Sequence, residues 1–585
     1  MIPYTAPLRD MQFLLEELIG LDQVSGLPGY DDVSDDLVRA VLAEAGKFGS
    51  EVLAPLNRGG DTEGARLENG VVTTAPGFAD AYKSFVDGGW NGLVCDTEFG
   101  GQGLPWLVAT PVSEIWDSAN LAFSLCPMLT LSAIELLTIH GTDEQRATYL
   151  EKLVTGEWTG TMNLTEPQAG TDIGAIRCRA VKDGDHYRLT GQKIFITWGE
   201  HDVADNIIHM VLARVQGAPD GVKGLSLFIV PKFLVNADGA PGPRNDLRCV
   251  SLEHKLGIHG SPTAVMSYGD DDGAVGYLVG EENRGIEYMF TMMNNARLAV
   301  GLEGVAIAER AYQQARDYAA NRIQGRAADG TPATLDRHLD VRRTLMTMKC
   351  RTEAMRALAY SVAASSDIAR RHPDAETRAR QRARLDLLVP VVKAWSTDQG
   401  VEIASMGVQV HGGAGFIEET GAAQHYRDAR ITPIYEGANG IQALDLVGRK
   451  VLGDGGAAAR ELFDEMRAFA RPSNGGSGDG ALEEAIGSLQ RATDWIVANG
   501  MPGAAVGATP YLELFGIVGG GYLMARSASI ADSKLADANG EASFYRAKIA
   551  TAEFYAGNIL PRAGGLERAE TIGSEALMAM PEDAL

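Results

Sequence analysis

The hydrophobic pattern of this chain changes its period twice, and this order of patterns constrains the fold more than any other feature. Apolar residues recur at helical spacing through most of residues 11–155. Between about 157 and 280 they lie in short β-rich runs bounded by Gly, Asp and Pro, as at 225–230. The helical period returns over 284–451. Helices, then a sheet, then helices form an uncommon order, which predicts a multidomain α+β protein.

Four units follow from these changes, since a domain usually holds about 100–200 residues and the chain has 585. We expect an N-terminal helical domain at 1–156, a central β-barrel-like sheet domain at 157–283 and a C-terminal helical bundle at 284–451. An extra helical layer is expected at 452–585, after the linker-like stretch PSNGGSGDG at 472–480. Three helical stretches are predicted beyond that linker, at roughly 481–499, 508–536 and 541–560.

The charge of the chain argues against nucleic-acid and membrane partners. There are 77 Asp and Glu against 52 Lys and Arg, a net charge of −25, and no basic run stands out. Such a surface repels a phosphate backbone and an anionic bilayer. No apolar stretch is expected to reach the roughly 18 residues needed to span a membrane, and the N-terminus resembles neither a signal nor a transit peptide. Five scattered cysteines indicate a reducing compartment, so we expect a cytoplasmic protein.

A metal centre has one candidate in the sequence. His201, Asp205 and His209 are four residues apart and would share one face of a helix. The segment 207–215 is typical of a strand, where His209 would be an ordinary sheet residue. We therefore predict no metal site. Phosphate-binding P-loops, GxSxG elbows and HExxH sites are also missing from the sequence.

Five segments in a fixed order carry a more specific signal than any single glycine-rich loop. They are TEPQAGTD (165–172), GQKIFIT (191–197), Arg297 with Gly301 and Gly304, QVHGGAG (409–415) and YEGANGIQ (435–442). In this order and spacing the chain resembles the acyl-CoA dehydrogenase family over roughly residues 35–450. Its start and its long C-terminal region resemble the subgroup of bacterial enzymes of nearly 600 residues, which act on fatty acyl-CoA or 3-methylthiopropionyl-CoA.

Glu436 is the candidate catalytic base. It follows Tyr435 and precedes Gly437, so a tight turn would present its carboxylate before a helix begins. Burial next to an apolar acyl chain would raise its pKa toward the working pH. Taken alone, the residue better suits a first-turn glutamate stabilised by the helix dipole, and it is the surrounding resemblance that favours the catalytic role. Some relatives carry the base just before the arginine that matches Arg297; here that residue is Ala296, which cannot accept a proton.

The resemblance implies FAD as cofactor and assigns further residues to it. Residues expected around the flavin ring and ribityl chain are Leu164, Thr165, Gly170, Thr171, Phe195 and Thr197. Residues expected at its pyrophosphate and adenosine, partly across a subunit boundary, are Arg322, Gln324, Gln409 and Gly413. Residues expected on the substrate side are Asn294, Arg297, Tyr435 and Gly437.

The reaction implied is α,β-dehydrogenation of an acyl-CoA thioester to a trans-2-enoyl-CoA, with electrons passed to an electron-transfer flavoprotein. A homodimer or a dimer of dimers is expected. Two alternatives stay open: an acyl-CoA oxidase that returns electrons to oxygen, and a non-catalytic acyl-CoA or flavin-binding assembly protein. Acyl chain length is left open as well.

Overall fold

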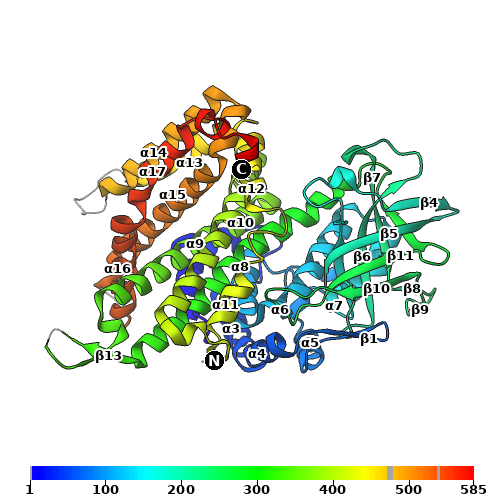
Figure 1. Ribbon diagram of the computed structural model, residues 1–585, viewed down its shortest axis with the longest axis horizontal. Helices are drawn as coiled ribbons and strands as arrows, with labels where there is room; N and C mark the ends of the chain where they lie inside the picture. The colour runs from blue at the N-terminus through cyan, green and yellow to red at the C-terminus, as the bar shows by residue number, and fades with distance from the viewer. Residues whose placement is uncertain (1–2, 328, 471–478, 537–539, 585) are drawn as a thin grey trace.

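The computed structural model describes residues 3–327, 329–470, 479–536 and 540–584. It confirms the predicted fold class: along the chain, helical segments precede and follow one sheet domain, and this domain lies at one side of the helices (Figure 1). The predicted limits at 156, 283 and 451 stay predictions, and each lies between elements or at the end of one. The predicted linker lies almost entirely outside the described residues.

Seven α-helices form the N-terminal part. They are α1 Leu8–Gln12, α2 Asp22–Ser25, α3 Asp35–Phe48, α4 Ala54–Glu63, α5 Phe78–Asp87, α6 Trp106–His140 and α7 Asp143–Thr155. Local signals account for several starts: the Ser34 side chain caps α3 by accepting from Leu37 N–H, and Thr142 with Gln145 forms a capping box at α7. Two π-helical turns, η1 (Phe13–Ile19) and η2 (Gly49–Leu53), lie between these helices.

Helix α6 is bent at Asn120, whose φ of −159° and ψ of 89° are not helical. The Asn120 side chain bonds on both sides of the bend: its amide donates to Leu53 C=O of η2 at 3.3 Å and accepts from Phe123 N–H of α6 at 3.2 Å. The bend separates the half that carries Asp117 from the half that carries Ser124. Both residues line the cavity described below.

The sheet domain closes on itself. Strands β5 (His186–Thr197), β12 (Ala274–Val279), β7 (Leu225–Pro231) and β6 (Asn206–Val215) pair in that order, and β4 (Arg179–Asp183) pairs with both β5 and β6. This arrangement removes free edges from the ring of strands. Three strands extend the ring: β11 (Thr263–Tyr268) beside β5, β10 (Leu247–Leu252) beside β11, and β3 (Trp158–Asn163) parallel to β6. Two strand pairs lie outside it: β1 Arg66–Glu68 with β2 Val71–Thr73, and β8 Phe233–Val235 with β9 Pro241–Arg244.

Three long antiparallel helices form the C-terminal bundle. They are α8 Gly285–Asn321, α9 Leu339–Arg371 and α10 Ala375–His411. The hairpin β13 (Ile323–Arg326) with β14 (Pro332–Thr334) projects between α8 and α9, and the short helices α11 (Ala422–Ala429) and α12 (Asn439–Asp445) follow α10. Helix α6 packs on α8 and α9, so the N-terminal domain and the bundle share one core.

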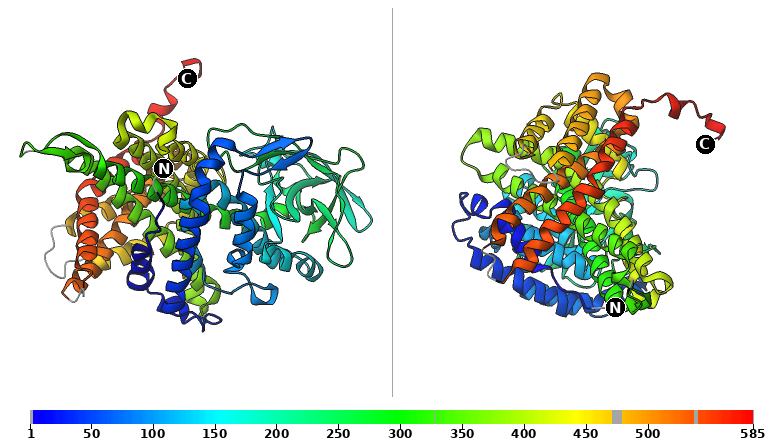
Figure 2. Two further views of the ribbon diagram at one scale, coloured as in Figure 1. Left: turned by 90° about the horizontal axis from the view of Figure 1, so that it is seen from below. Right: turned by 90° about the vertical axis from the view of Figure 1, so that its left-hand side faces the viewer.

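The last part of the chain forms the extra helical layer that was predicted. Its main helices are α13 Ala457–Ala470, α14 Asp479–Asn499, α15 Met501–Leu535, α16 Ala542–Asn558 and α17 Ala563–Thr571. Helix α15 lies against Trp395 of α10, and a Cβ on Gly516 would come within 2.3 Å of the indole, so only glycine permits this approach. The short helix α18 (Glu575–Met578) follows, and the end of the chain projects from the layer (Figure 2).

The N-terminus binds this layer directly. Arg9 Nε donates to Glu541 at 2.7 Å, and its guanidinium lies 4.2 Å from the centre of the Phe544 ring. Lys548 on α16 pairs with Asp10 at 2.5 Å. The layer is therefore joined to the start of the chain as well as to the bundle.

Two helices correct the expectation that no segment is apolar enough to span a membrane. α6 and α15 both have the necessary length and mean hydropathy. Within each apolar window, 78% of the residues of α6 and 72% of those of α15 are buried inside the fold. Both are therefore core helices, whose apolar surfaces are buried against other parts of the same molecule.

Candidate active site

Glu436 lies in a tight turn between α11 and α12, as the sequence predicts. Its φ of +55° is in the left-handed region, which is unfavourable for a glutamate, and Gly437 follows with φ of +90°. Asn439 N–H closes the turn by donating to Pro433 C=O at 3.0 Å. Strained backbone of this kind persists only where surrounding contacts hold it, and it is common at active sites.

The electrostatic surroundings of Glu436 suit a proton acceptor at neutral pH. Burial raises the pKa of this carboxyl to about 7, although the charges of Arg297 and Lys393 act to lower it. The residue keeps partial contact with solvent. No described residue accepts a hydrogen bond from the Glu436 N–H or bonds to its carboxylate. The carboxylate and its own N–H are thus both free to meet a ligand.

Lys393 of α10 holds the turn in place. Its buried Nζ donates to Gly437 C=O at 2.9 Å and to Asn439 Oδ1 at 2.8 Å. Asn439 in turn donates to Asp398 at 2.8 Å and to Thr397 Oγ1 at 2.9 Å. Burial lowers the pKa of Lys393 to about 8, while Glu436 acts in the opposite direction. Sequence reasoning missed Lys393; its signal was a lysine inside an otherwise apolar helical stretch.

Two further carboxyl groups, those of Glu303 and Asp117, are linked to the turn through Tyr435. Tyr435 Oη donates a hydrogen bond to Glu303 of α8, and burial together with Asp117 raises the pKa of Glu303 well above its ordinary value. Burial also raises the pKa of Asp117 on α6 to about 7. Glu303 and Asp117 were not identified from sequence, because each is a single acidic residue in a helical pattern without a motif around it.

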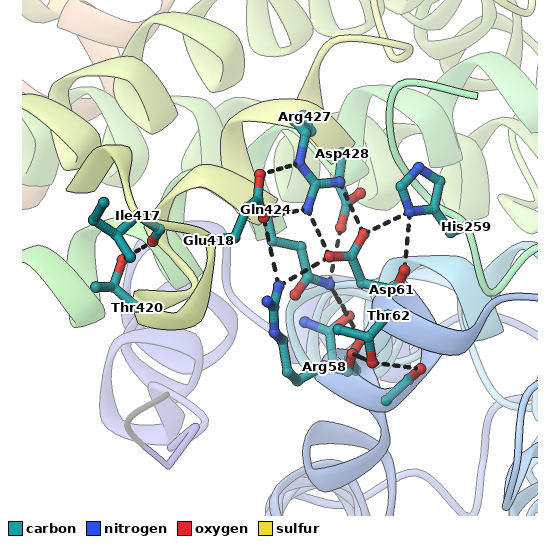
Figure 3. A network of polar contacts seen from close by, with 12 residues as sticks. Arg58, Asp61, Thr62, His259, Ile417, Glu418, Thr420, Gln424, Arg427 and Asp428 are labelled. Atoms are coloured by element: carbon teal, nitrogen blue, oxygen red, sulfur yellow. Dashed lines mark hydrogen bonds and ion pairs between the residues drawn. The ribbon is translucent and has the colours of Figure 1, made fainter. Parts of the chain in front are cut away.

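A network of ion pairs fixes the helix that leads into the turn (Figure 3). Arg427 of α11 binds both oxygens of Asp61 on α4, at 2.8 and 2.6 Å, and Glu418 at 2.8 Å. His259, from the sheet domain, approaches Asp61 within 3.0 Å. The neighbouring Asp428 accepts from Ile258 N–H at 2.6 Å. Three parts of the fold therefore meet just before Glu436.

A cavity of about 90 Å³ is lined by residues of α6, α8 and the segment around Trp90. Its wall is largely apolar and aromatic, with Phe85, Trp90, Leu93, Trp106, Trp116 and Met128 among its residues. Asp117 and Ala299 also line it, and Glu303 is one helical turn beyond Ala299 on α8. The cavity therefore lies next to the part of α8 that carries Glu303, the partner of Tyr435.

The residues predicted around the flavin ring come together at the ends of β3 and β5. Ile194 N–H donates to Thr165 C=O at 2.9 Å, and Thr161 Oγ1 donates to Thr197 C=O at 2.7 Å. Phe195 is 58% exposed and has φ of +61°. Leu164 is buried next to Thr165, whereas Gly170 and Thr171 follow on an exposed loop.

Two buried residues anchor this loop, and sequence reasoning gave neither a role. Lys193 Nζ bonds to Leu164 C=O at 2.9 Å and to Glu166 at 2.7 Å. Glu166 also accepts from Arg177 and Cys178 N–H, at 2.7 and 3.0 Å. Trp198, for which the sequence offered no explanation, is buried and donates to Ala122 C=O on α6 at 3.1 Å. It joins the end of β5 to the N-terminal domain.

The residues predicted at the adenosine end lie elsewhere in the same chain. Arg322 immediately precedes strand β13, and Gln324 lies on it. The β13 hairpin projects from the bundle, far from the sheet domain (Figure 1). Gln409 and Gly413 lie at the end of α10, where His411 stacks on Tyr318 with ring centres 4.4 Å apart. All four residues are exposed. Within one chain, Arg322 and Gln324 therefore do not come together with the predicted flavin-ring residues of the sheet domain.

The substrate-side pair is divided as well. Arg297 is buried and lies 3.8 Å from Asp445, close enough to Glu436 to influence its pKa. Asn294, one turn earlier on α8, is exposed. Tyr435 and Gly437 flank Glu436 in the turn. The face of α8 that carries both residues is therefore exposed to solvent at Asn294 and buried near the candidate base at Arg297.

The metal interpretation receives no support. His209 is buried in strand β6, and its Nδ1 lies 3.2 Å from Tyr268 Oη. Among the described residues no group of three or more His, Cys, Asp or Glu could hold a metal ion. All five cysteines are free thiols and buried.

Known proteins match this chain along nearly its whole length. The acyl-CoA dehydrogenase N-terminal, middle and C-terminal domain models match residues 37–157, 161–270 and 283–452. An acetyl-CoA dehydrogenase C-terminal-like model matches 462–581. The chain is 50% identical to 3-methylmercaptopropionyl-CoA dehydrogenase of Ruegeria pomeroyi, covering 95% of this chain and 96% of that protein.

A second relative and a solved structure agree with this assignment. The chain is 34% identical to a broad-specificity linear acyl-CoA dehydrogenase of Mycobacterium tuberculosis, over 95% of this chain and 96% of that protein. Its fold resembles Caenorhabditis elegans ACDH-11 in complex with C11-CoA, with a TM-score of 0.77, 22% identity and coverage of 95% and 92% of the two chains. The chain belongs to the acyl-CoA dehydrogenase family.

Proposed function

We propose that this protein is a cytoplasmic, FAD-dependent acyl-CoA dehydrogenase with Glu436 as its catalytic base. The substrate is a fatty acyl-CoA or 3-methylthiopropionyl-CoA, and the product is the trans-2-enoyl-CoA. The observation that carries the proposal is the strained turn that holds a carboxyl group with a pKa of about 7 between Arg297 and Lys393. The 50% identical relative carries the name of this reaction class, and five buried thiols suit a reducing compartment.

The chain's own residues supply the proton chemistry. The Glu436 carboxylate removes the proton from the carbon next to the thioester, and a pKa near the working pH suits this step. The free N–H of Glu436 donates to the thioester oxygen, where negative charge develops. Lys393 keeps Gly437 and Asn439 fixed, so the carboxylate and the N–H keep their relative geometry.

The residues at the ends of β3 and β5 fit a flavin. An aromatic side chain left 58% exposed, Phe195, offers a flat apolar surface, and the neighbouring Thr165, Thr171 and Thr197 offer hydroxyl and backbone polar groups for ring and phosphate oxygens. A Cβ on Gly170 would meet nothing within 4 Å, so the loop leaves open space there. When bound, FAD supplies the ring that accepts the hydride from the β-carbon.

A homodimer follows from the division of the cofactor site. Arg322, Gln324, Gln409 and Gly413 are exposed, and the β13 hairpin of the first two lies far from the sheet domain in Figure 1, so these residues serve the cofactor of a second copy. An arginine at this place suits a pyrophosphate, because its guanidinium forms paired hydrogen bonds with phosphate oxygens. Electrons leave through an electron-transfer flavoprotein.

The test is anaerobic addition of acyl-CoA substrates, including 3-methylthiopropionyl-CoA, to the FAD-loaded protein. A dehydrogenase loses the visible absorbance of its oxidised flavin and then reduces an electron-transfer flavoprotein or an artificial acceptor. In a parallel assay under air, release of hydrogen peroxide in step with turnover would instead identify an oxidase. Absence of flavin binding would favour a non-catalytic assembly protein.

Replacing Lys393 with methionine is expected to shift the pH dependence of turnover. The ammonium group favours the ionised form of Glu436, so its loss raises the pKa of Glu436 above about 7. The acidic limb of the kcat profile then moves to higher pH by about one unit, because turnover requires the ionised base. At pH 7 we expect roughly fivefold lower kcat, recovered in part at pH 8.

Lys548→Met is the matched control. Lys548, in the C-terminal layer, is also buried, but it pairs with Asp10 of α1 and Glu353 of α9. Its loss is expected to lower the melting temperature without moving the pH profile. A Lys393→Met profile that coincides with that of the wild type would contradict the positioning of Glu436 by Lys393.

A further inference from the structure

Two hollows on either side of Trp90 bear on the length of acyl chain that the enzyme accepts. The first is the cavity of about 90 Å³ whose wall includes Asp117 of α6, which acts on the pKa of Glu303 behind the Glu436 turn. The second is a groove of about 590 Å³ that opens to solvent between α3, η2 and α5. Trp90 and Leu93 line both of them. These two residues are thus the shared wall between an inner pocket and the outside.

The indole of Trp90 contacts both sides of this wall. Toward the cavity it packs edge-on against Trp116, with ring centres 5.2 Å apart. Toward the groove its centre lies 6.4 Å from that of Phe48, which lines only the groove. A Cβ on Gly88, another groove residue, would lie 2.6 Å from the indole nitrogen. The side chain itself therefore fills the space between the two hollows.

The backbone around Trp90 is held firmly. Trp90 begins the 3-10 turn η3 (Trp90–Gly92), and Gly89 precedes it with φ of +68°. Asn91 Nδ2 donates to Leu153 C=O on α7 at 2.6 Å, and Gln102 Nε2 donates to Gly89 C=O at 2.9 Å. These bonds keep the turn in one position, so the wall does not depend on a mobile loop.

The volume of the cavity limits the length of acyl chain that it can hold. A 150 Å³ apolar cavity holds the six carbons of benzene, roughly 25 Å³ for each heavy atom. The cavity here therefore admits about four heavy atoms by the same measure. The α- and β-carbons lie at Glu436 and the flavin, outside the cavity, so an acyl chain of about seven carbons, with about four beyond the β-carbon, fills it. The sulfur and methyl group of 3-methylthiopropionyl fit within the same space. The groove beyond is lined by Val41, Phe48 and Val52 together with the charged Glu44, Lys47 and Glu51. Its apolar side chains would accept several more methylenes.

We propose that Trp90 is the stop that restricts this enzyme to short acyl chains, and that the groove behind it is an extension of the acyl pocket which the indole closes. The proposal rests on the proposed dehydrogenase function. It predicts a gain of substrate range when the indole is removed. Each methylene that then enters apolar surroundings strengthens binding roughly fourfold.

The experiment measures kcat/KM of the holoenzyme for butyryl-, 3-methylthiopropionyl-, hexanoyl-, octanoyl- and decanoyl-CoA with an artificial acceptor. The wild type is expected to fall on the order of 100-fold between butyryl- and decanoyl-CoA, because methylenes that do not fit are strongly rejected. In Trp90→Ala the ratio of decanoyl- to butyryl-CoA activity is expected to rise on the order of 100-fold. Trp90→Phe, which preserves an aromatic ring, is expected to lie between them.

Trp106→Ala is the matched control. Trp106 lines the cavity but not the groove, so its removal enlarges the pocket without joining the two hollows. We expect this variant to gain one or two carbons of chain length only. Equal gains in Trp90→Ala and Trp106→Ala would assign the effect to cavity size and overturn the proposal.

Two other results are equally decisive. If the wild type already prefers decanoyl-CoA, Trp90 is not a stop, although the dehydrogenase function stands. If the wild type oxidises no acyl-CoA of any length, the proposed function fails, and the chain-length proposal fails with it. Should Trp90→Ala not fold, the Trp90→Phe ratio decides: an unchanged ratio contradicts the proposal.

Discussion

Replacing Glu436 with glutamine is expected to lower turnover on acyl-CoA by about 10³–10⁴-fold, since a positioned general base contributes up to this much. Glutamine keeps the size of the side chain and the backbone of the strained turn, but it cannot accept the α-proton. Arg297 and Lys393 are cationic and cannot replace it, and the buried Glu303 carboxyl is already bound by Tyr435 Oη. Rapid mixing of the variant with substrate under anaerobic conditions should leave the flavin oxidised.

Two comparisons make this result specific. Glu436→Asp retains a carboxylate one methylene shorter and is expected to keep partial activity. The flavin content of Glu436→Gln should equal that of the wild type, because Glu436 lies outside the ends of β3 and β5 where the ring is proposed to bind. Wild-type rates of flavin bleaching in Glu436→Gln would remove Glu436 from the mechanism.

Replacing Arg356 with methionine is expected to cost about 3–5 kcal/mol of stability, the usual result of breaking a buried ion pair from one side. Arg356 is 1% exposed. Its guanidinium binds Glu114 of α6 at 2.7 Å and Glu309 of α8 at 2.7 Å. Without it two carboxylates remain in the core where three long helices meet. Thermal and denaturant unfolding of the holoenzyme measure the loss.

Arg39→Met is the control for this prediction. Arg39 also forms two hydrogen bonds with one carboxylate, that of Glu16, at 2.8 and 2.7 Å, but the pair lies at the surface. Exposed ion pairs contribute little, so its melting temperature should barely change. Adding Glu114→Gln to Arg356→Met is expected to restore part of the stability, because one of the two unpaired charges disappears. A fully stable Arg356→Met protein would show that the triad does not hold the helices together.

The C-terminal layer shows how much a local pattern can predict. Helical spacing alone predicted helices near 481–499, 508–536 and 541–560, and the structure has α14, α15 and α16 there. The middle helix begins at Met501, earlier than predicted, because Pro502 is tolerated in the first turn of a helix. The pattern gave no indication that Arg9 and Asp10 bind α16, since those partners are more than 500 residues apart.

The proposed active site divides in the same way. Glu436, its turn and the Thr165 and Phe195 segments could be proposed as site residues from the sequence, because each depends on a short run of residues. Lys393, Glu303 and Asp117 could not, because their roles come from contacts across three helices. The division of Asn294 from Arg297 also needed the packed structure, since helical spacing gives a shared face but not what covers it.

By itself, the sequence determined the order of helices and strands, the free cysteines and the turn that carries the candidate base. These depend on hydrophobic period and backbone preference, which act over a few residues. Only the tertiary structure decided the surroundings of that base, the anchoring of the C-terminal layer to the first residues and the position of Trp90 between a cavity and a groove. Burial, pKa and pocket length depend on distances between residues remote in the chain, and those distances exist only after the helices and the sheet have packed.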